Sequence, residues 1–260
     1  MFEDVDPYLI LLLFVAVILA VSLAGAFVPR IMKLNMRQAH LLVALSAGII
    51  LGILFFVLLP ETFEAAHEEG AGDMDAVFLM AGGFRVIVLI DVIMKRKYTC
   101  SCTDCIDKDH IHEVTSFTAF AGLAVHAAVD GILLSIALIA GGEVAVAMII
   151  AIALHKFADV FALSSIFALT KIEKRKTLIY MIVFILITPI AAIVSMPIMD
   201  AVGDLNEFIP LAFATGILMY VGIYTLLPEA FHERRDTLIS FVLVVIGIIA
   251  IAAIALTLGH

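Results

Sequence analysis

The stretch YLILLLFVAVILAVSLAGAFV, residues 8–28, contains no charged residue and is long enough to cross a bilayer as a helix. Apolar runs of similar length recur along the 260-residue chain, of which 64% is hydrophobic and 15% is charged. Soluble domains carry about 25% charged residues, so the composition indicates a polytopic membrane protein. The acidic residues before the first run favour a retained helix over a cleaved signal. The net charge of −9 does not favour nucleic-acid binding.

We predict an all-α fold with eight transmembrane helices, because lipid offers no partner for open backbone groups. The predicted spans are residues 8–29, 38–63, 75–95, 114–139, 144–169, 177–199, 207–231 and 237–258, in a single transmembrane domain over residues 1–260. The word LLPETFEAAHE ends the second span and LLPEAFHERRD ends the seventh, in opposite directions across the membrane. This pair of similar sequences indicates an inverted repeat of helices 1–3 and 6–8 around the central helices 4 and 5.

The basic residues predict the orientation of these helices. Thirteen of the 15 lie between spans one and two, three and four, five and six, and seven and eight: Arg30, Lys33, Arg37, Lys95, Arg96, Lys97, Lys108, Lys171, Lys174, Arg175, Lys176, Arg234 and Arg235. The loops on the other side, residues 64–74, 140–143 and 200–206, contain no lysine or arginine. Because positive loops stay in the cytosol, we expect both termini to lie outside.

The words HAAVDG, residues 126–131, and LHKFAD, residues 154–159, each place a histidine and an aspartate four residues apart inside an apolar span. Residues i and i+4 share one face of a helix, so His126 pairs with Asp130 and His155 with Asp159. The two spans are joined by a short turn and run antiparallel, with both pairs about halfway along. Two imidazoles and two carboxylates at one depth predict a site for Zn²⁺ or a similar divalent ion. A purely structural role is the alternative, at a cost of about 2.5–3.5 kcal/mol for each buried carboxylate.

The predicted cytosolic loop over residues 95–113 contains the word CSCTDCIDKDHIHE. Its candidate metal ligands are Cys100, Cys102, Cys105, His110 and His112. Thiolates and imidazoles bind zinc, and cytosolic thiols stay reduced. We interpret the loop as a metal-receiving or metal-sensing segment, with a polar linker as the alternative.

The paired motifs resemble those of the Zrt/Irt-like (ZIP) family of metal transporters. HAAVDG is similar to the family's fourth-helix motif His-Asn/Ser-x-x-Asp/Glu-Gly, and HKFAD to its fifth-helix motif His-Glu-x-Pro-His-Glu. The resemblance implies a transporter, not an enzyme, that carries chiefly Zn²⁺ into the cytosol through the four-ligand site, with Cd²⁺, Fe²⁺ and Mn²⁺ as further candidates and no resident cofactor. It also implies a homodimer in the cell membrane, in which helices one, four, five and six shift like an elevator against the other four.

Two residues depart from the family pattern. Ala127 stands where many members have asparagine, and Lys156 stands where many have a carboxylate of a second metal site. One branch of the family does have His-Lys in the fifth helix, so the lysine is not foreign to it. We hypothesise a single-metal site in which Lys156 is a built-in counter-cation.

Two other classes of zinc protein remain as alternatives. A cation-diffusion-facilitator exporter also uses two His-x-x-x-Asp pairs, but on non-consecutive helices of six spans. An intramembrane zinc hydrolase would leave one metal position open for water. Separately, Arg85 falls inside the third span, where a charge needs a partner or a wet cavity, and Asp91 belongs to a different helix face.

Overall fold

The computed structural model describes residues 7–31, 35–99, 108–140, 142–170, 172–202, 206–232 and 236–258, and all regular structure in these ranges is helical. The elements are α1 Pro7–Ile31, α2 Met36–Ile53, η1 Leu54–Leu58, α3 Leu59–Glu68, α4 Asp73–Thr99, α5 Lys108–Ala140, α6 Gly142–Phe167, α7 Lys174–Val202, α8 Phe208–Tyr220, η2 Val221–Leu226, α9 Leu227–Ala230 and α10 Thr237–Leu258. The all-α prediction is confirmed.

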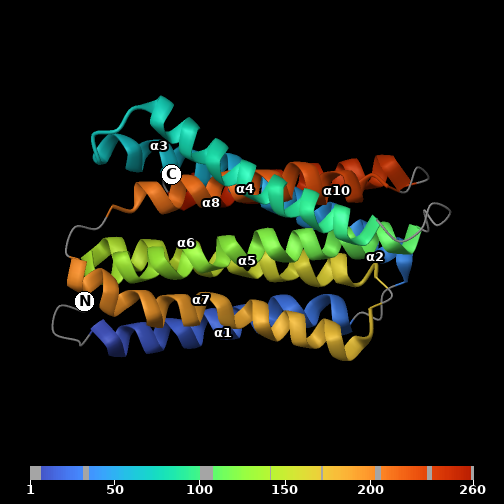
Figure 1. The fold of residues 1–260 in the computed structure, drawn as a ribbon, viewed down its shortest axis with the longest axis horizontal. Helices are drawn as coiled ribbons and strands as arrows, with labels where there is room; N and C mark the ends of the chain where they lie inside the picture. Colours follow the sequence, from blue (N-terminus) through green and yellow to red (C-terminus); the bar gives the residue numbers. More distant parts are fainter. Residues whose placement is uncertain are drawn as a thin grey trace.

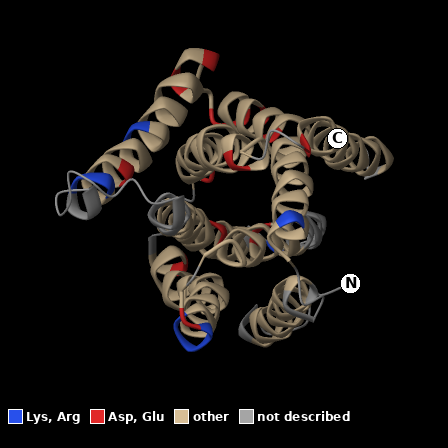
Figure 2. Cartoon of the chain, turned by 90° about the vertical axis from the view of Figure 1, so that its right-hand side faces the viewer, with Lys and Arg blue, Asp and Glu red and all other residues tan. Residues whose placement is uncertain are grey.

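These elements form eight long rods, because α2, η1 and α3 are continuous and so are α8, η2 and α9. Seven rods are long and apolar enough over their described residues to cross a membrane. The eighth, α6, has 26 residues and coincides with the predicted fifth span. Both termini lie toward the left end of Figure 1. Figure 2 looks onto the opposite end, where the lysines and arginines drawn in blue cap several helices.

The two Leu-Pro-Glu motifs, Leu59–Glu61 and Leu227–Glu229, have the same local structure. A π-helical turn, η1 or η2, comes directly before Leu59–Glu61 in one rod and before Leu227–Glu229 in the other. A proline inside a helix lacks a backbone donor and its ring clashes with the carbonyl four residues earlier. A wider π turn relieves that clash, so Pro60 and Pro228 are accommodated within long rods. The larger inverted repeat stays a prediction.

The helices pack as two groups. The most extensive contacts pair α2 with α10 and α4 with α8 in one group, and α5 with α7 and α1 with α6 in the other. The α2–α10 pair is close because Gly48 and Gly247 lie at its contact: a Cβ at Gly48 would overlap the carbonyl of Val244, and one at Gly247 would lie 2.7 Å from Ile49 N. The groups meet where α2 packs on α6 and where α5 packs on α8 and α4. Figure 1 shows α5 and α6 side by side, at the face of their group that meets the other group.

Candidate metal centre

Two His–Asp pairs face each other across α5 and α6. His126 and Asp130 lie one turn apart on α5, and His155 and Asp159 lie one turn apart on α6. One ligand atom from each residue lies within 4.8 Å of the others, and all four residues are buried. The structure therefore brings together the four residues that the two sequence words single out.

The distances within the group match the size of a metal ion. The Nε2 atom of His126 lies 3.5 Å from Oδ1 of Asp130 and 4.0 Å from Oδ2 of Asp159. The Nε2 atom of His155 lies 3.4 Å from Oδ2 of Asp130. Bonds of about 2.1 Å to a tetrahedral zinc ion would separate neighbouring ligand atoms by about 3.4 Å. The arrangement thus needs little adjustment to surround one divalent ion.

Several polar atoms of this group make no hydrogen bond to any described residue. They are both ring nitrogens of His126, Nε2 of His155 and both carboxylate oxygens of Asp159. Buried polar atoms in proteins are normally paired, because leaving them unpaired costs free energy. Nitrogen and oxygen lone pairs converging in one buried place are what a borderline metal such as Zn²⁺ binds.

A fifth charged group lies inside the cluster. Lys156 is 1% exposed, and its Nζ lies 2.7 Å from Oδ2 of Asp130 and 3.6 Å from Oδ2 of Asp159. The same ammonium lies 5.7 Å from the ring centroid of Phe184 on α7, within cation–π range. Lys156 therefore does not extend to water at a helix end. It pairs with the two carboxylates of the predicted site.

Helix α7 supports the site from the side. The Oγ1 of Thr188 donates a 2.8 Å hydrogen bond to the carbonyl of Ala127. A Cβ on Gly131 would lie 2.6 Å from the carbonyl oxygen of Thr188 and 2.6 Å from Cβ of Ala191. Glycine after Asp130 thus lets α5 approach α7 closely. Phe184 and Thr188 were missed by sequence reasoning, since an isolated phenylalanine or threonine in an apolar span has no distinguishing pattern.

The predicted cytosolic loop, residues 95–113, lies only partly within the described residues. Cys100, Cys102 and Cys105 lie outside the described residues. His110 and His112 belong to the first turns of α5, so the helix begins earlier than the predicted boundary at residue 114. Helix α4 likewise extends to Thr99, beyond its predicted end at residue 95. The interpretation of this segment as a metal-receiving loop stays a prediction.

A second polar group, at the same end of the rods as this segment, was not predicted. His40, near the start of α2, has its Nδ1 3.9 Å from Oε1 of Glu229 in α9, and both residues are buried. The His40 ring stacks on His232 at 6.0 Å between centroids. Glu229 belongs to the second Leu-Pro-Glu motif that the sequence shows. Its contact with His40 depends on the packing of α2 against α9, which the sequence does not indicate.

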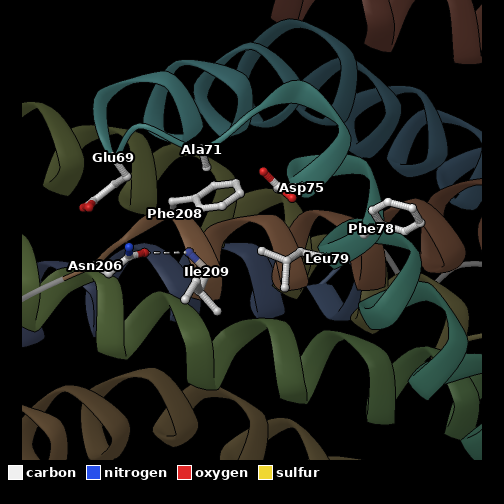
Figure 3. A pocket seen from close by; sticks show the side chains of 8 residues that line it. All are labelled: Glu69, Ala71, Asp75, Phe78, Leu79, Asn206, Phe208 and Ile209. Atoms are coloured by element: carbon white, nitrogen blue, oxygen red, sulfur yellow. Dashed lines mark hydrogen bonds between the residues drawn. The ribbon is translucent and has the colours of Figure 1, made fainter.

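The structure also has an open hollow of about 470 Å³ far from the His–Asp group in the chain. Its lining includes Glu69, Asp75, Phe78, Asn206 and Phe208, from the α3–α4 connection and the start of α8. Figure 3 shows Asn206 accepting a hydrogen bond from the backbone N–H of Ile209 beside it. None of the four predicted ligands lines this hollow, so we do not assign it to the metal centre.

Fold and site together define a class: a polytopic membrane protein with a buried group of candidate metal ligands between two of its helices. The sequence profile of the family described as ZIP Zinc transporter matches residues 99–255, more than half of the chain. This chain therefore belongs to the ZIP family, whose members are transporters and not enzymes. Because of this membership, the protein is a divalent metal transporter. The two alternative classes, a cation-diffusion-facilitator exporter and an intramembrane zinc hydrolase, no longer apply.

Individual relatives agree with the family. The zinc transporter ZIP9 of Micropogonias undulatus is 26% identical over 262 residues, covering 84% of each chain. Zinc transporter ZIP9-A of Xenopus laevis is 24% identical over 254 residues with the same coverage. Zinc transporter ZIP1 of Takifugu rubripes is 27% identical over 143 residues, covering 54% of this chain and 47% of its own.

Proposed function

We propose that this protein carries Zn²⁺ into the cytosol, one ion at a time, through a site formed by His126, Asp130, His155 and Asp159. The observation that carries the proposal is the convergence of these four buried side chains within 4.8 Å. Four protein ligands favour binding and release of an ion over activation of a water molecule. Cd²⁺, Fe²⁺ and Mn²⁺ are further candidate ions for the same nitrogen and oxygen ligands.

The role of Lys156 in this proposal follows from formal charge. With neutral histidines, Asp130 and Asp159 alone carry two negative charges without an ion and none with a divalent ion. The Lys156 ammonium, in contact with both carboxylates, changes these sums to one negative and one positive charge. The solvation cost of a charge in a low-dielectric medium rises with its square. As a built-in counter-cation, Lys156 thus gives the loaded and unloaded sites net charges of equal size.

The movement that alternates access is proposed to follow the two helix groups. The group of α1, α5, α6 and α7 contains all four ligands and Lys156. The group of α2, α4, α8 and α10 has its own close pairs and contributes no ligand. An elevator-like shift of the first group against the second would carry the ion across while leaving each group internally packed. A homodimer formed through the second group, in the cell membrane with both termini outside, completes the proposal.

Zinc uptake by the purified protein in sealed proteoliposomes tests the site. We expect His155→Ala and Asp159→Ala to reduce uptake severely, because each removes a ligand. His67→Ala is the matched control, since this exposed histidine pairs with Asp73 at the end of the rods. Normal uptake by both α6 variants would refute the site.

A second measurement addresses the loop. Replacement of Cys100, Cys102 and Cys105 by serine is expected to lower zinc binding on the cytosolic side while uptake through the membrane site continues. Loss of all uptake in this triple variant would contradict an accessory role for the loop.

A further inference from the structure

Helix α4 has two contrasting faces. One face packs inside the protein through residues that include Ala76, Met80, Ile87 and Asp91. The other face carries a stripe spaced by four and three residues, namely Phe78, Gly82, Arg85, Leu89 and Val92, which we call the outer stripe. Phe78, Leu89 and Val92 are 64%, 59% and 53% exposed, and Arg85 is exposed as well. In Figure 1, α4 runs diagonally from the upper left down toward the right.

The depth of Arg85 makes this stripe unusual. Arg85 lies near the middle of the 24-residue span Asp73–Arg96. Half of a hydrocarbon core of about 30 Å separates it from either interface, farther than an arginine side chain extends. No described residue forms an ion pair or hydrogen bond with Arg85. Asp91 is engaged elsewhere, by Lys95 at 2.7 Å and Thr118 at 2.8 Å. An arginine facing lipid at this depth is strongly unfavourable, and since the described part of the chain offers it no partner, a group on another molecule is the expected one.

Gly82 points to the same face independently. A Cβ built on Gly82 meets no atom within 4 Å, so packing inside this chain does not require glycine there. The next residue gives the contrast, because a Cβ on Gly83 would overlap the carbonyl of Phe213 on α8. Small residues in membrane helices let a second helix backbone approach closely. Gly82 therefore provides a notch beside Arg85 on the outward face.

The charge of Arg85 indicates what kind of helix would bind to the outer stripe. A guanidinium in hydrocarbon is best matched by a carboxylate at the same depth. Asp91, Asp130, Asp159 and Glu229 are buried, whereas Glu61 and Glu64 are less buried but lie close to the end of the span Met36–Glu68. A second copy would therefore present no carboxylate from its described spans at the depth of Arg85. We propose that the outer stripe binds a transmembrane helix of a different protein that has an Asp or Glu near its midpoint. The exposed face of α10 remains for the homodimer proposed above.

Synthetic transmembrane peptides test this inference. The full-length protein, fluorescently labelled, is reconstituted in vesicles with labelled polyleucine peptides that carry one central Asp or, as the control, leucine throughout. Energy transfer should show that the Asp peptide associates with the wild-type protein and the all-leucine peptide does not. Arg85→Leu should weaken the association at least about tenfold, and Gly82→Leu should also weaken it. Neither residue belongs to the proposed transport site, so retained zinc uptake would show that both variants are folded.

Two results would overturn the proposal. One is an Asp peptide that binds Arg85→Leu as well as it binds the wild-type protein, or that binds neither. The other is efficient disulfide crosslinking between two protomers through Leu89→Cys, which would show that a second copy covers the outer stripe. Both results would leave zinc transport by the His–Asp site unaffected.

Discussion

The Nζ atom of Lys156 lies 2.7 Å from Oδ2 of Asp130, the same oxygen that faces Nε2 of His155 at 3.4 Å. An ion bound by His155 and Asp130 would therefore meet the ammonium at this oxygen. In the proposed single-metal site, the lysine would weaken the attraction for a divalent ion and would stabilise the carboxylates when no ion is bound. The proposal therefore favours rapid release and return of the ion over tight binding.

This relationship predicts the behaviour of Lys156→Met, which keeps the length of the side chain and removes its charge. We expect zinc to bind more tightly and uptake to become slower, because the unloaded site would carry two uncompensated negative charges. Breaking a buried ion pair costs about 3–5 kcal/mol, so the metal-free variant should also be less stable. Zinc should then raise its unfolding temperature more than it raises that of the wild-type protein.

Equilibrium zinc titration, uptake rates and thermal unfolding of the same preparations check this prediction. Counting bound ions by mass spectrometry, in a protein whose loop cysteines are replaced, should give one per chain. Two ions at full occupancy between α5 and α6 of the wild-type protein would contradict the counter-cation role.

Zinc affinity should depend on pH. Metal binding needs neutral imidazoles and ionised carboxylates, so protons and the ion compete for His126, Asp130, His155 and Asp159. We expect weaker binding at pH 5.5 than at pH 7.5, and proton release on binding. Isothermal titration in buffers of different ionisation enthalpy measures both. Equal affinity at the two pH values would argue against these ligands.

Gly131 and Gly82 form a matched pair of substitutions. Gly131→Ala places a Cβ 2.6 Å from the carbonyl of Thr188, so α5 and α7 must separate beside Asp130. Overpacking of this kind typically costs about 1–3 kcal/mol, and the shift should also impair uptake. Gly82→Ala meets open space and should leave both properties near wild type. Gly131→Ala should therefore show slower uptake and a lower unfolding temperature than Gly82→Ala. If the two variants are indistinguishable, the contact between α5 and α7 adjusts freely.

Glu207, which precedes the span beginning at Phe208, predicts a pH effect on stability. Burial and the nearby charges of Glu68 and Glu69 raise the pKa of Glu207 above its ordinary value of 4.5. A raised pKa of an acid favours folding below the ordinary value, and this contribution is lost as the pH rises through the folded value. Glu207→Gln should therefore increase stability at neutral pH by less than about 1 kcal/mol, since the site is half exposed.

Thermal unfolding in detergent at pH 7 and near pH 4 measures this difference, because Glu207→Gln should give no gain at the lower value. Asp200→Asn, at an exposed acid near the same end, is the control. A destabilised Glu207→Gln at pH 7 would show that the carboxylate is held by favourable contacts instead.

The parts of this site that could be predicted from the sequence are those set by local helix geometry. His126 with Asp130 and His155 with Asp159 follow from the i+4 spacing, and the short connection between α5 and α6 brings the pairs together. The approach of Phe184 and Thr188 depends on how α7 packs against α5, which no local pattern specifies. The His40–Glu229 contact likewise joins residues from rods far apart in the chain.

The fold, like the site, has features that could be predicted from the sequence and features that could not. Span number and approximate boundaries follow from apolar run length, although polar ends such as Lys95–Thr99 continue the helix beyond the apolar run. The π turns before Pro60 and Pro228 were not predicted, because a proline in an apolar run also fits a kink or a helix end. The outward direction of Arg85 depends on which face of α4 packs against α8.

The close pairing of α2 with α10 has a consequence for biosynthesis. Gly48 and Gly52 lie on a rod made early in translation, whereas Val244 and Ile251, which contact them, lie on the last rod. At about 5–20 residues per second, the ribosome needs roughly 10–40 s to make the chain between them. During that interval the glycine face of α2 can meet lipid or a chaperone but not its native neighbour. Nascent chains truncated before α10 should therefore be targets for membrane quality control, even though every residue of the proposed metal site has already been synthesised.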